Sequence, residues 1–214
     1  MEEIMRRVFW VATVVVMALA LASCGSTSGN DDEQVLDTIS FDGEGITQCD
    51  QFVGSNLQVD VQQDVCSDDT IETFTDTFAN ANVQNNQKLD ITINKYTVVV
   101  EGASLGTLTY NLTDTVPGKR CTNQATLSCA ADRDCVTLGG VGTCQPSQTA
   151  IALLLFDIAT KIRLTPDLVP FGRTLTVNIT LFGTDVSGGD WQSTGSINAI
   201  FQDVDNCMAC TLTQ

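Results

Sequence analysis

The stretch Leu175-Thr-Val177-Asn-Ile179-Thr-Leu181 alternates apolar and polar residues without a break. Alternation with a period of two places one face of a β-strand on a core and the other face in water. The same pattern recurs at 57–61, 89–93, 96–100, 105–112 and 196–201. Helix-forming residues never fill an amphipathic helical window. The sequence therefore predicts an all-β protein built from antiparallel strands.

Two segments fit this pattern less clearly. Residues 71–83 carry Phe74 and Phe78 four positions apart, as on a helix face, but threonines alternate with them, so we predict a strand. Residues 150–158 form a nearly unbroken apolar run, which is either a strand buried on both faces or a short helix. We favour the strand because its neighbours are strands.

Turn-forming residues separate the strand-like runs. They are Asp42-Gly43, Asn85-Asn86, Glu101-Gly102, Pro117-Gly118, Pro166-Asp167 and Ser187-Gly-Gly-Asp190. Several strands joined by such turns, with no long helix, favour a β-sandwich.

The amino-terminal segment has the organisation of an export signal. Arg6 and Arg7 precede residues 8–22, in which only Thr13 is polar. This run is shorter than the roughly 20 residues of a membrane-spanning helix and suits a signal peptide. It ends in Leu21-Ala22-Ser23-Cys24, which resembles the lipobox of bacterial lipoproteins. The resemblance implies diacylglycerol on the Cys24 sulfur, cleavage before Cys24 and acylation of the new amino terminus. An ordinary signal cut near Ala22 and an uncleaved anchor are the alternatives.

The expected domain organisation follows from this site. Residues 1–23 form the signal peptide, and residues 24–34, which are small, polar and acidic, form a lipidated flexible tether. Residues 35–214 form the β-sandwich domain. Position 25 is Gly rather than the Asp that retains enteric lipoproteins in the inner membrane, so the resemblance implies an outer-membrane anchor, on either face.

Composition excludes several classes of function. The formal net charge is −16, which repels phosphate backbones, so we expect no nucleic-acid partner. It also disfavours adsorption to anionic lipid, and the membrane contact is expected through the covalent lipid. Histidine is absent, which excludes Ser-His-Asp and Cys-His catalysis. No catalytic residues are predicted, and we expect no enzyme.

Nine cysteines are present. With Cys24 assigned to the lipid, eight remain, and in an exported protein they predict disulfides. These are Cys49, Cys66, Cys121, Cys129, Cys135, Cys144, Cys207 and Cys210.

The four cysteines of residues 121–144 lie in a cysteine-rich insertion that lacks a hydrophobic run. Two bridges are expected within it, with all three pairings open, and a zinc site is the alternative. Cys207-Met-Ala-Cys210 is the one C-x-x-C motif. It lacks the βαβ context of a redox site, so it predicts a bridge within the pair or to Cys49 and Cys66, which could also bond to each other.

From residue 88 onward the order of segments resembles the immunoglobulin-like sandwich lipoproteins of Gram-negative bacteria. The resemblance is carried by residues 91–98, 175–190 and 194–201. It implies an immunoglobulin-like antiparallel β-sandwich and carries no activity with it. The disulfide-stapled insertion departs from a plain sandwich.

Acidic residues in or beside the late loops are the candidate metal ligands. They are Asp185, Asp190, Asp203 and Asp205. No cofactor is expected, but the carboxylates of these residues could bind calcium, although none matches the EF-hand spacing. Solvated acidic loops are the simpler interpretation.

The sequence thus predicts an outer-membrane-anchored lipoprotein that acts as a non-catalytic envelope structural or protein-binding module, with a protein partner in the envelope. A calcium-dependent adhesin or ligand-binding domain is the alternative. A carboxylate hydrolase and a thiol redox protein rank below both.

Overall fold

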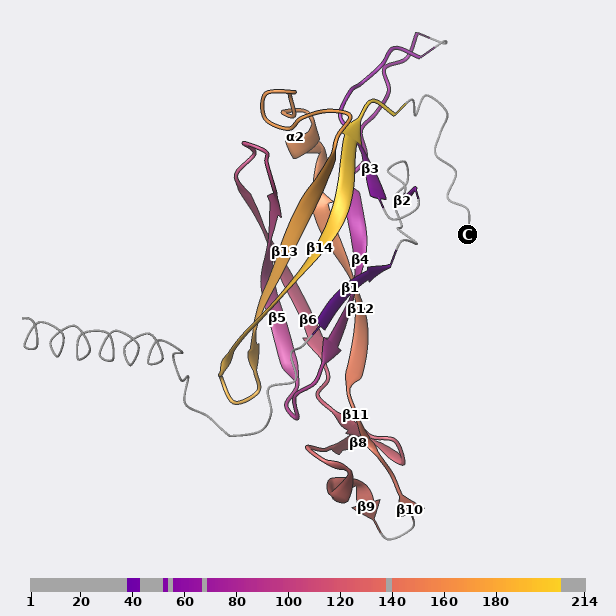
Figure 1. Cartoon of the computed structure of the whole chain (residues 1–214), viewed down its shortest axis with the longest axis vertical. Coiled ribbons are helices and arrows are strands. Elements are labelled where there is room, and N and C mark those ends of the chain that lie inside the picture. The colour runs from indigo at the N-terminus through magenta and orange to yellow at the C-terminus, as the bar shows by residue number, and fades with distance from the viewer. Residues whose placement is uncertain (1–37, 43–51, 54–55, 67–68, 138–139, 205–214) are drawn as a thin grey trace, which may run out of the picture. The chain divides into compact units, whose positions relative to one another are not determined.

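The computed structural model describes residues 38–42, 52–53, 56–66, 69–137 and 140–204. Contacts divide the chain into two units, Met1–Gln34 and Val35–Gln214, and every described residue belongs to the second. Two β-sheets pack against each other in this unit (Figure 1). No helix among the described residues is long and apolar enough to span a membrane.

The smaller sheet of the sandwich has three strands, and the larger sheet has six. In spatial order, the smaller contains β1 (Thr38–Asp42), β4 (Thr77–Asn85) and β12 (Ser147–Phe156). The larger contains β2 (Phe52–Val53), β3 (Asn56–Asp60), β14 (Asp190–Gln202), β13 (Thr174–Asp185), β5 (Ile91–Val100) and β6 (Thr107–Val116). All pairs are antiparallel except β3 with β14, which is parallel. The orders β1-β4-β12 and β5-β13-β14 correspond to strands A-B-E and C-F-G of the immunoglobulin-like sandwich, which confirms the predicted fold class.

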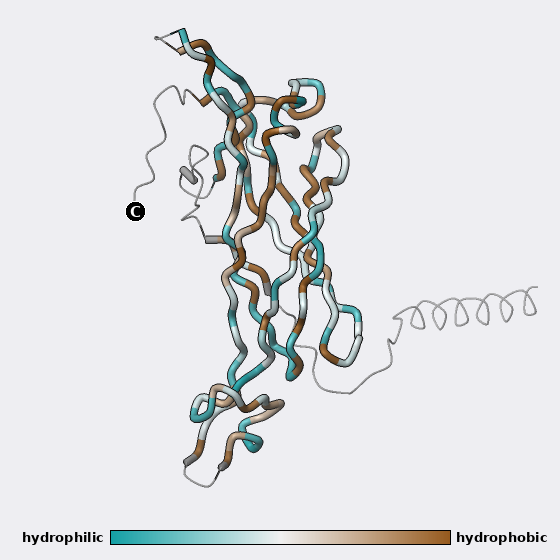
Figure 2. Tube along the Cα trace, turned by 180° about the vertical axis from the view of Figure 1, so that it is seen from behind, coloured by the Kyte–Doolittle hydropathy of each residue, from teal (hydrophilic) through white to brown (hydrophobic). Residues whose placement is uncertain are grey.

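The central strand β13 contains the alternating stretch 175–181. Val177, Ile179 and Leu181 are fully buried between the sheets, while Thr180 on the outer face pairs with Thr194 of β14 and with Thr97 of β5. One face of β13 is thus packed in the core and the other is polar, as its period of two predicts. Figure 2 shows the same alternation along the neighbouring strands.

The core contains apolar side chains from both sheets. Leu153 and Leu155 from β12 and Val83 from β4 are fully buried in the same cluster as Ile179. The ring of Phe156 meets that of Phe201 edge-on, with centroids 5.2 Å apart. Every buried residue of this cluster lies within residues 57–201, so a chain that begins at residue 25 retains the whole core.

The strand predictions for the two ambiguous segments are each correct only in part. Residues 147–156 form the favoured strand, but Ala150 and Ala152 are exposed, so burial on both faces is wrong. The short helix α2 (Ile158–Lys161) follows, capped by the Asp157 carboxylate, which accepts a hydrogen bond from the Thr160 amide at 2.6 Å. The strand predicted for 71–83 begins only at Thr77, and the prediction is wrong for residues 72–76.

Strand β1 was not predicted, because it is short and only Ile39 and Phe41 are apolar in it. It pairs with β4 along its whole length and also contacts the larger sheet. A Cβ at Gly195 of β14 would lie 2.9 Å from the Phe41 ring and 3.1 Å from Ile39. The absence of a side chain at Gly195 lets β1 cross the larger sheet at this point.

Two tyrosines join the sheets along the side where β6 and β12 lie. The hydroxyl of Tyr96 donates to the Leu154 carbonyl at 2.9 Å, and that of Tyr110 donates to the Leu155 carbonyl at 3.0 Å. The rings stack with centroids 5.3 Å apart. Burial, which disfavours the charged phenolate, raises the pKa of each tyrosine to about 12.

This tyrosine pair predicts a loss of stability in alkali. An unfolded tyrosine ionises near pH 10, whereas the folded pair ionises at about 12. The stabilisation is therefore complete below about pH 10 and is lost as the pH rises toward about 12. We expect the free energy of unfolding in urea to fall over this window less steeply for the double variant Tyr96→Phe, Tyr110→Phe.

The chain has two tyrosines, so tyrosinate absorbance in the folded protein reports this pair alone. Half-ionisation near pH 10 in the folded protein would contradict the burial of the pair.

Candidate binding site in the cysteine-rich insertion

The insertion connects β6 to β12 and lies beyond one end of the sandwich (Figure 1). A small sheet forms its base, in the order β11 (Cys144–Gln145), β7 (Arg120–Cys121) and β8 (Gln124–Ser128). The 3-10 helix η1 (Asp132–Cys135) leads into the hairpin of β9 (Val136–Thr137) and β10 (Gly140–Val141). The strands of the insertion are too short for a period-two pattern to predict them.

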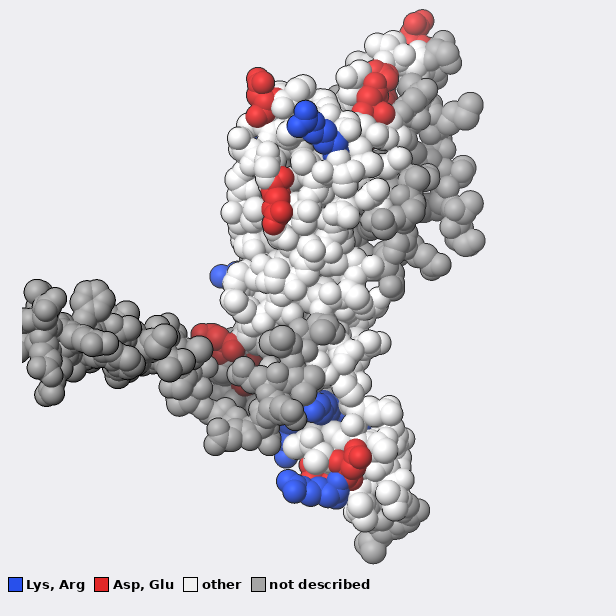
Figure 3. Space-filling model, viewed as in Figure 1, with Lys and Arg blue, Asp and Glu red and all other residues white. Residues whose placement is uncertain are grey.

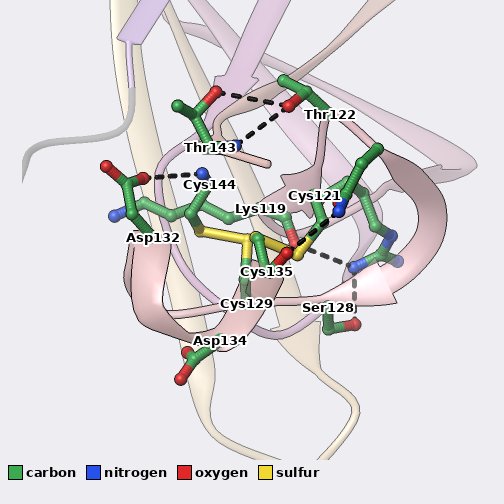
Figure 4. The surroundings of a disulfide bond; sticks show 12 residues. Lys119, Cys121, Thr122, Ser128, Cys129, Asp132, Asp134, Cys135, Thr143 and Cys144 are labelled. Atoms are coloured by element: carbon green, nitrogen blue, oxygen red, sulfur yellow. Dashed lines mark hydrogen bonds between the residues drawn. A yellow bond between two sulfur atoms is a disulfide. The ribbon is translucent and has the colours of Figure 1, made fainter. Parts of the chain in front are cut away.

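Two interleaved disulfides hold the insertion together (Figure 4). Cys121 bonds to Cys135 and Cys129 bonds to Cys144, which selects one of the three pairings left open by the sequence. The buried sulfurs pack with Leu127 in a small cluster of their own. Each bridge closes a loop of about 15 residues, for which chain entropy predicts about 3 kcal/mol of stabilisation. The disulfides thus stabilise the insertion in place of a hydrophobic core.

The same sulfurs are the only group in the described part of the chain with the spacing of a metal site. Those of Cys121, Cys129 and Cys135 lie within 4.8 Å of one another. All three are oxidised in disulfides, and a disulfide sulfur is not the thiolate that zinc requires. The zinc alternative therefore does not fit the paired cysteines.

Both acidic side chains of the insertion make internal hydrogen bonds. The Asp134 carboxylate accepts from the amides of Ala130 at 2.8 Å and Ala131 at 3.2 Å, and these bonds lower the pKa of Asp134. Asp132 accepts from the Cys144 amide at 2.8 Å. The two carboxylates therefore help to set the backbone of η1 and β11 (Figure 4).

Hydrogen bonds and an ion pair fix the junction between the insertion and the sandwich. The Asp90 carboxylate, just before β5, accepts from the Gly118 amide at 2.8 Å and forms an ion pair with Arg120. The Gly118 hydrogen bond and Arg120 lower the pKa of Asp90. The Ser147 hydroxyl donates to the Gly118 carbonyl at 2.7 Å. A Cβ at Gly118 would lie 2.3 Å from the Lys88 carbonyl oxygen, so only glycine fits here.

The hairpin of β9 and β10 exposes an apolar pair, which we call the tip. Val136 and Val141 are cross-strand neighbours and are 61 % and 86 % exposed. An exposed cross-strand valine pair on a stapled support has the character of an interaction site. The sequence analysis did not identify these valines.

Charged side chains of both signs accompany the insertion. Residues 121–144 contain one basic side chain, at 133, and two acidic ones, at 132 and 134. Lys119 and Arg120 precede them, and Arg120 is paired with Asp90 at the junction. Figure 3 shows both basic and acidic atoms over the insertion, whereas the middle of that face carries few charged atoms.

The predicted calcium ligands that the structure describes are not all brought together. Asp185 and Asp190 flank the turn between β13 and β14, whereas Asp203 follows the far end of β14. Thirteen residues of strand separate the two positions, roughly 40 Å. Asp205 lies outside the described residues. The expectation of a common site is therefore wrong for Asp203, because an extended strand holds it away from the turn.

Asp185 instead stabilises its own turn. One oxygen of its carboxylate accepts from the Ser187 hydroxyl at 2.6 Å, the Ser187 amide at 2.7 Å and the Gly189 amide at 2.9 Å. These bonds, the Ser187 hydroxyl foremost, lower the pKa of Asp185. The residue thus acts as a side-chain cap of a β-turn.

The remaining predicted sites fall mostly outside the described residues. These are Cys24, Cys49, Cys207 and Cys210. Cys66 is described, buried and disulfide-bonded. Because the four insertion cysteines pair with one another, the partner of Cys66 also lies outside the described residues.

Comparison with protein-family models gives no match to this chain, and comparison with curated proteins gives none either.

The close approach at Gly118 predicts that adding a single methyl group there lowers the stability of the fold. Gly118→Ala forces its new methyl group against the Lys88 backbone, and we expect a loss of about 3 kcal/mol in the free energy of unfolding in urea. Gly106→Ala is the matched control. Gly106 has a φ of +78° and no atom within 4 Å of an added Cβ, so only backbone strain of about 1 kcal/mol is expected. Equal losses in the two variants would show that the close approach at Gly118 is not a constraint.

Proposed function

We propose that this chain is an outer-membrane-anchored lipoprotein whose sandwich presents the insertion to a protein partner, as a non-catalytic binding module of the cell envelope. The observation that carries the proposal is the tip, an exposed valine pair on a support fixed by two disulfides. Such a support binds without the entropic cost of ordering a loop, because the backbone is already fixed.

Sequence features support the anchor. The lipobox-like residues 21–24 follow a signal-like apolar run, and the polar residues 25–33 suit a tether. A flexible chain of the 11 residues 24–34 has a root-mean-square reach of roughly 18 Å. The module would therefore operate close to the membrane surface.

The chemistry of the tip favours a protein partner. Two exposed valines with charged side chains of both signs close by in the chain match an apolar pocket that has a polar rim, the usual composition of a protein interface. The absence of histidine and the use of Asp132, Asp134 and Asp185 in internal hydrogen bonds support a role other than catalysis.

The anchor predicts a defined amino terminus. Mass spectrometry of the protein from membranes should give a mature chain that begins at Cys24 and carries diacylglycerol and an acyl group on its amino terminus. Cys24→Ser should abolish lipid labelling and leave the protein unprocessed. An unmodified Cys24, or a mature chain that starts elsewhere, would exclude the lipid anchor.

The binding role predicts that the tip controls cross-linking to a partner in intact cells. Replacing a buried contact valine costs about 1.5 kcal/mol, which is about tenfold in affinity. We therefore expect Val136→Ser, Val141→Ser to lower the yield of the cross-linked species about tenfold or more. Val186→Ser is the matched control, since Val186 is 69 % exposed and lies in the turn between β13 and β14. Unchanged cross-linking in the tip variant would remove the tip from the binding role.

A further inference from the structure

The chain enters the sandwich at the end that carries the insertion. Thr38, where β1 begins, and Gln148, near the start of β12, both pair with Gln84 of β4, one on each side of it. Strand β12 follows the insertion directly, so Thr38 lies level with the base of the insertion. The amino-terminal entry to the domain and the insertion are therefore at the same end of the sandwich.

The opposite end of the sandwich, which we call the far end, lies well beyond β1. A Cβ at Gly195 of β14 would lie 3.1 Å from Ile39. Strand β14 ends seven residues later, at Gln202, which is roughly 24 Å along a strand. Strand β3 runs parallel to β14, so the connection from β3 to β4 also leaves at the far end.

The length of chain between the proposed lipid and the domain favours the insertion end as the end that faces the membrane. Residues 24–37 precede Thr38, and a flexible chain of these 14 residues has a root-mean-square reach of roughly 20 Å. Val141 precedes Gln148 by seven residues, so the tip lies at most about 24 Å beyond the level of Thr38. The far end lies at least about 24 Å away in the opposite direction, and the chain would have to run back alongside the sandwich to bring it to the membrane. The tip, in contrast, reaches the plane of the lipid without such a reversal.

The small size of the tip favours a partner that is confined to the same membrane. Burial of its two valines contributes about 3 kcal/mol, which corresponds to a dissociation constant in the millimolar range. Such a contact would be rarely populated with a dilute soluble protein. Attachment of both molecules to one membrane raises their effective concentration, so a weak contact becomes populated without further binding surface.

A protein fits the tip better than the bilayer itself does. Asp132, Arg133 and Asp134 are exposed within four positions of Val136. Two of these three charges are carboxylates, which anionic lipid repels. Valine also differs from tryptophan and tyrosine, which anchor proteins at membrane interfaces. An apolar pair with charges of both signs near it is instead compatible with the core and rim of a protein interface.

We propose that the tip binds an integral protein of the membrane that anchors this chain, at the surface of that membrane and beside the lipid. This inference rests on the proposed function and names the class and the location of the partner. The lipid supplies the local concentration, and the tip supplies the specific contact.

The test measures cross-linking in intact cells from a photoreactive amino acid at position 133, beside the tip. Two matched variants carry the same Gly/Ser segment, either between residues 34 and 35 or after residue 214. A segment of about 40 residues at the first position lengthens the tether from about 14 to about 54 residues, so the cross-linking yield should fall about eightfold. The same segment after residue 214 should leave the yield unchanged, because it does not separate the lipid from the domain.

Two further properties should accompany the tether dependence. The cross-linked protein should be integral to the membrane, so it should stay in the membrane fraction after extraction with alkaline carbonate. Val136→Ser, Val141→Ser should lower its yield about tenfold or more, whereas Val186→Ser should not. Matching unfolding midpoints of the purified variants should show that all of them fold.

Other results would overturn the inference. Tip-dependent cross-linking to a soluble protein, equal in the two Gly/Ser variants, would reject a partner in the membrane and retain the proposed binding role. The bilayer would be the partner if brominated lipid in protein-free vesicles quenched a fluorescent amino acid at position 133, the valine substitutions abolished this quenching, and cells gave no cross-linked protein. Absence of both tip-dependent cross-linking and lipid quenching would reject the proposed binding role together with the inference.

Discussion

The contact of Gly118 with the Lys88 backbone, beside the Asp90 carboxylate, joins the insertion to the sandwich. Two disulfides make the insertion rigid in itself, but they do not fix its direction. The direction is set where the chain leaves β6, by hydrogen bonds to Asp90 and Ser147 and by a glycine that admits no side chain. If the direction of the insertion were not fixed, its internal rigidity would not lower the entropic cost of binding. The proposed role of the tip therefore depends on this junction.

Charge is distributed unevenly over the molecule. The outer face of the larger sheet carries hydroxyl side chains in register, with Thr194, Thr180, Thr97 and Thr109 paired in a row across four strands. Such a face is hydrated through hydrogen bonds from its hydroxyl groups to water rather than through charged side chains. Charged side chains of both signs lie mainly in the connections and in the insertion (Figure 3).

The sequence predicted the strands whose stability comes from alternate burial. Strands β5, β13 and β14 are long and central, and each has apolar residues on one face over many positions. Strand β1 escaped prediction because it is short, and because its pairing with β4 and its contact with Gly195 across the sandwich have no local signature. Residues 72–76 alternate threonine with other side chains like a strand, but no strand forms there and only the isolated bridge from Ile71 to Val65 precedes them. The spacing of the insertion cysteines could not predict their disulfide pairing either, because three pairings are compatible with the same sequence.

The interleaved order of the two disulfides has a consequence for resistance to proteolysis. A protease that cuts any one peptide bond between Cys121 and Cys144 leaves at least one bridge that spans the cut. The amino-terminal part, with β4 to β6, then stays covalently attached to the part that contains β12 to β14. Bridges between neighbouring cysteines, 121 with 129 and 135 with 144, would leave residues 130–134 unspanned, and neither bridge would then hold the two sides of a cut there together. The observed pairing therefore keeps the strands on both sides of the insertion linked after any single cut within it.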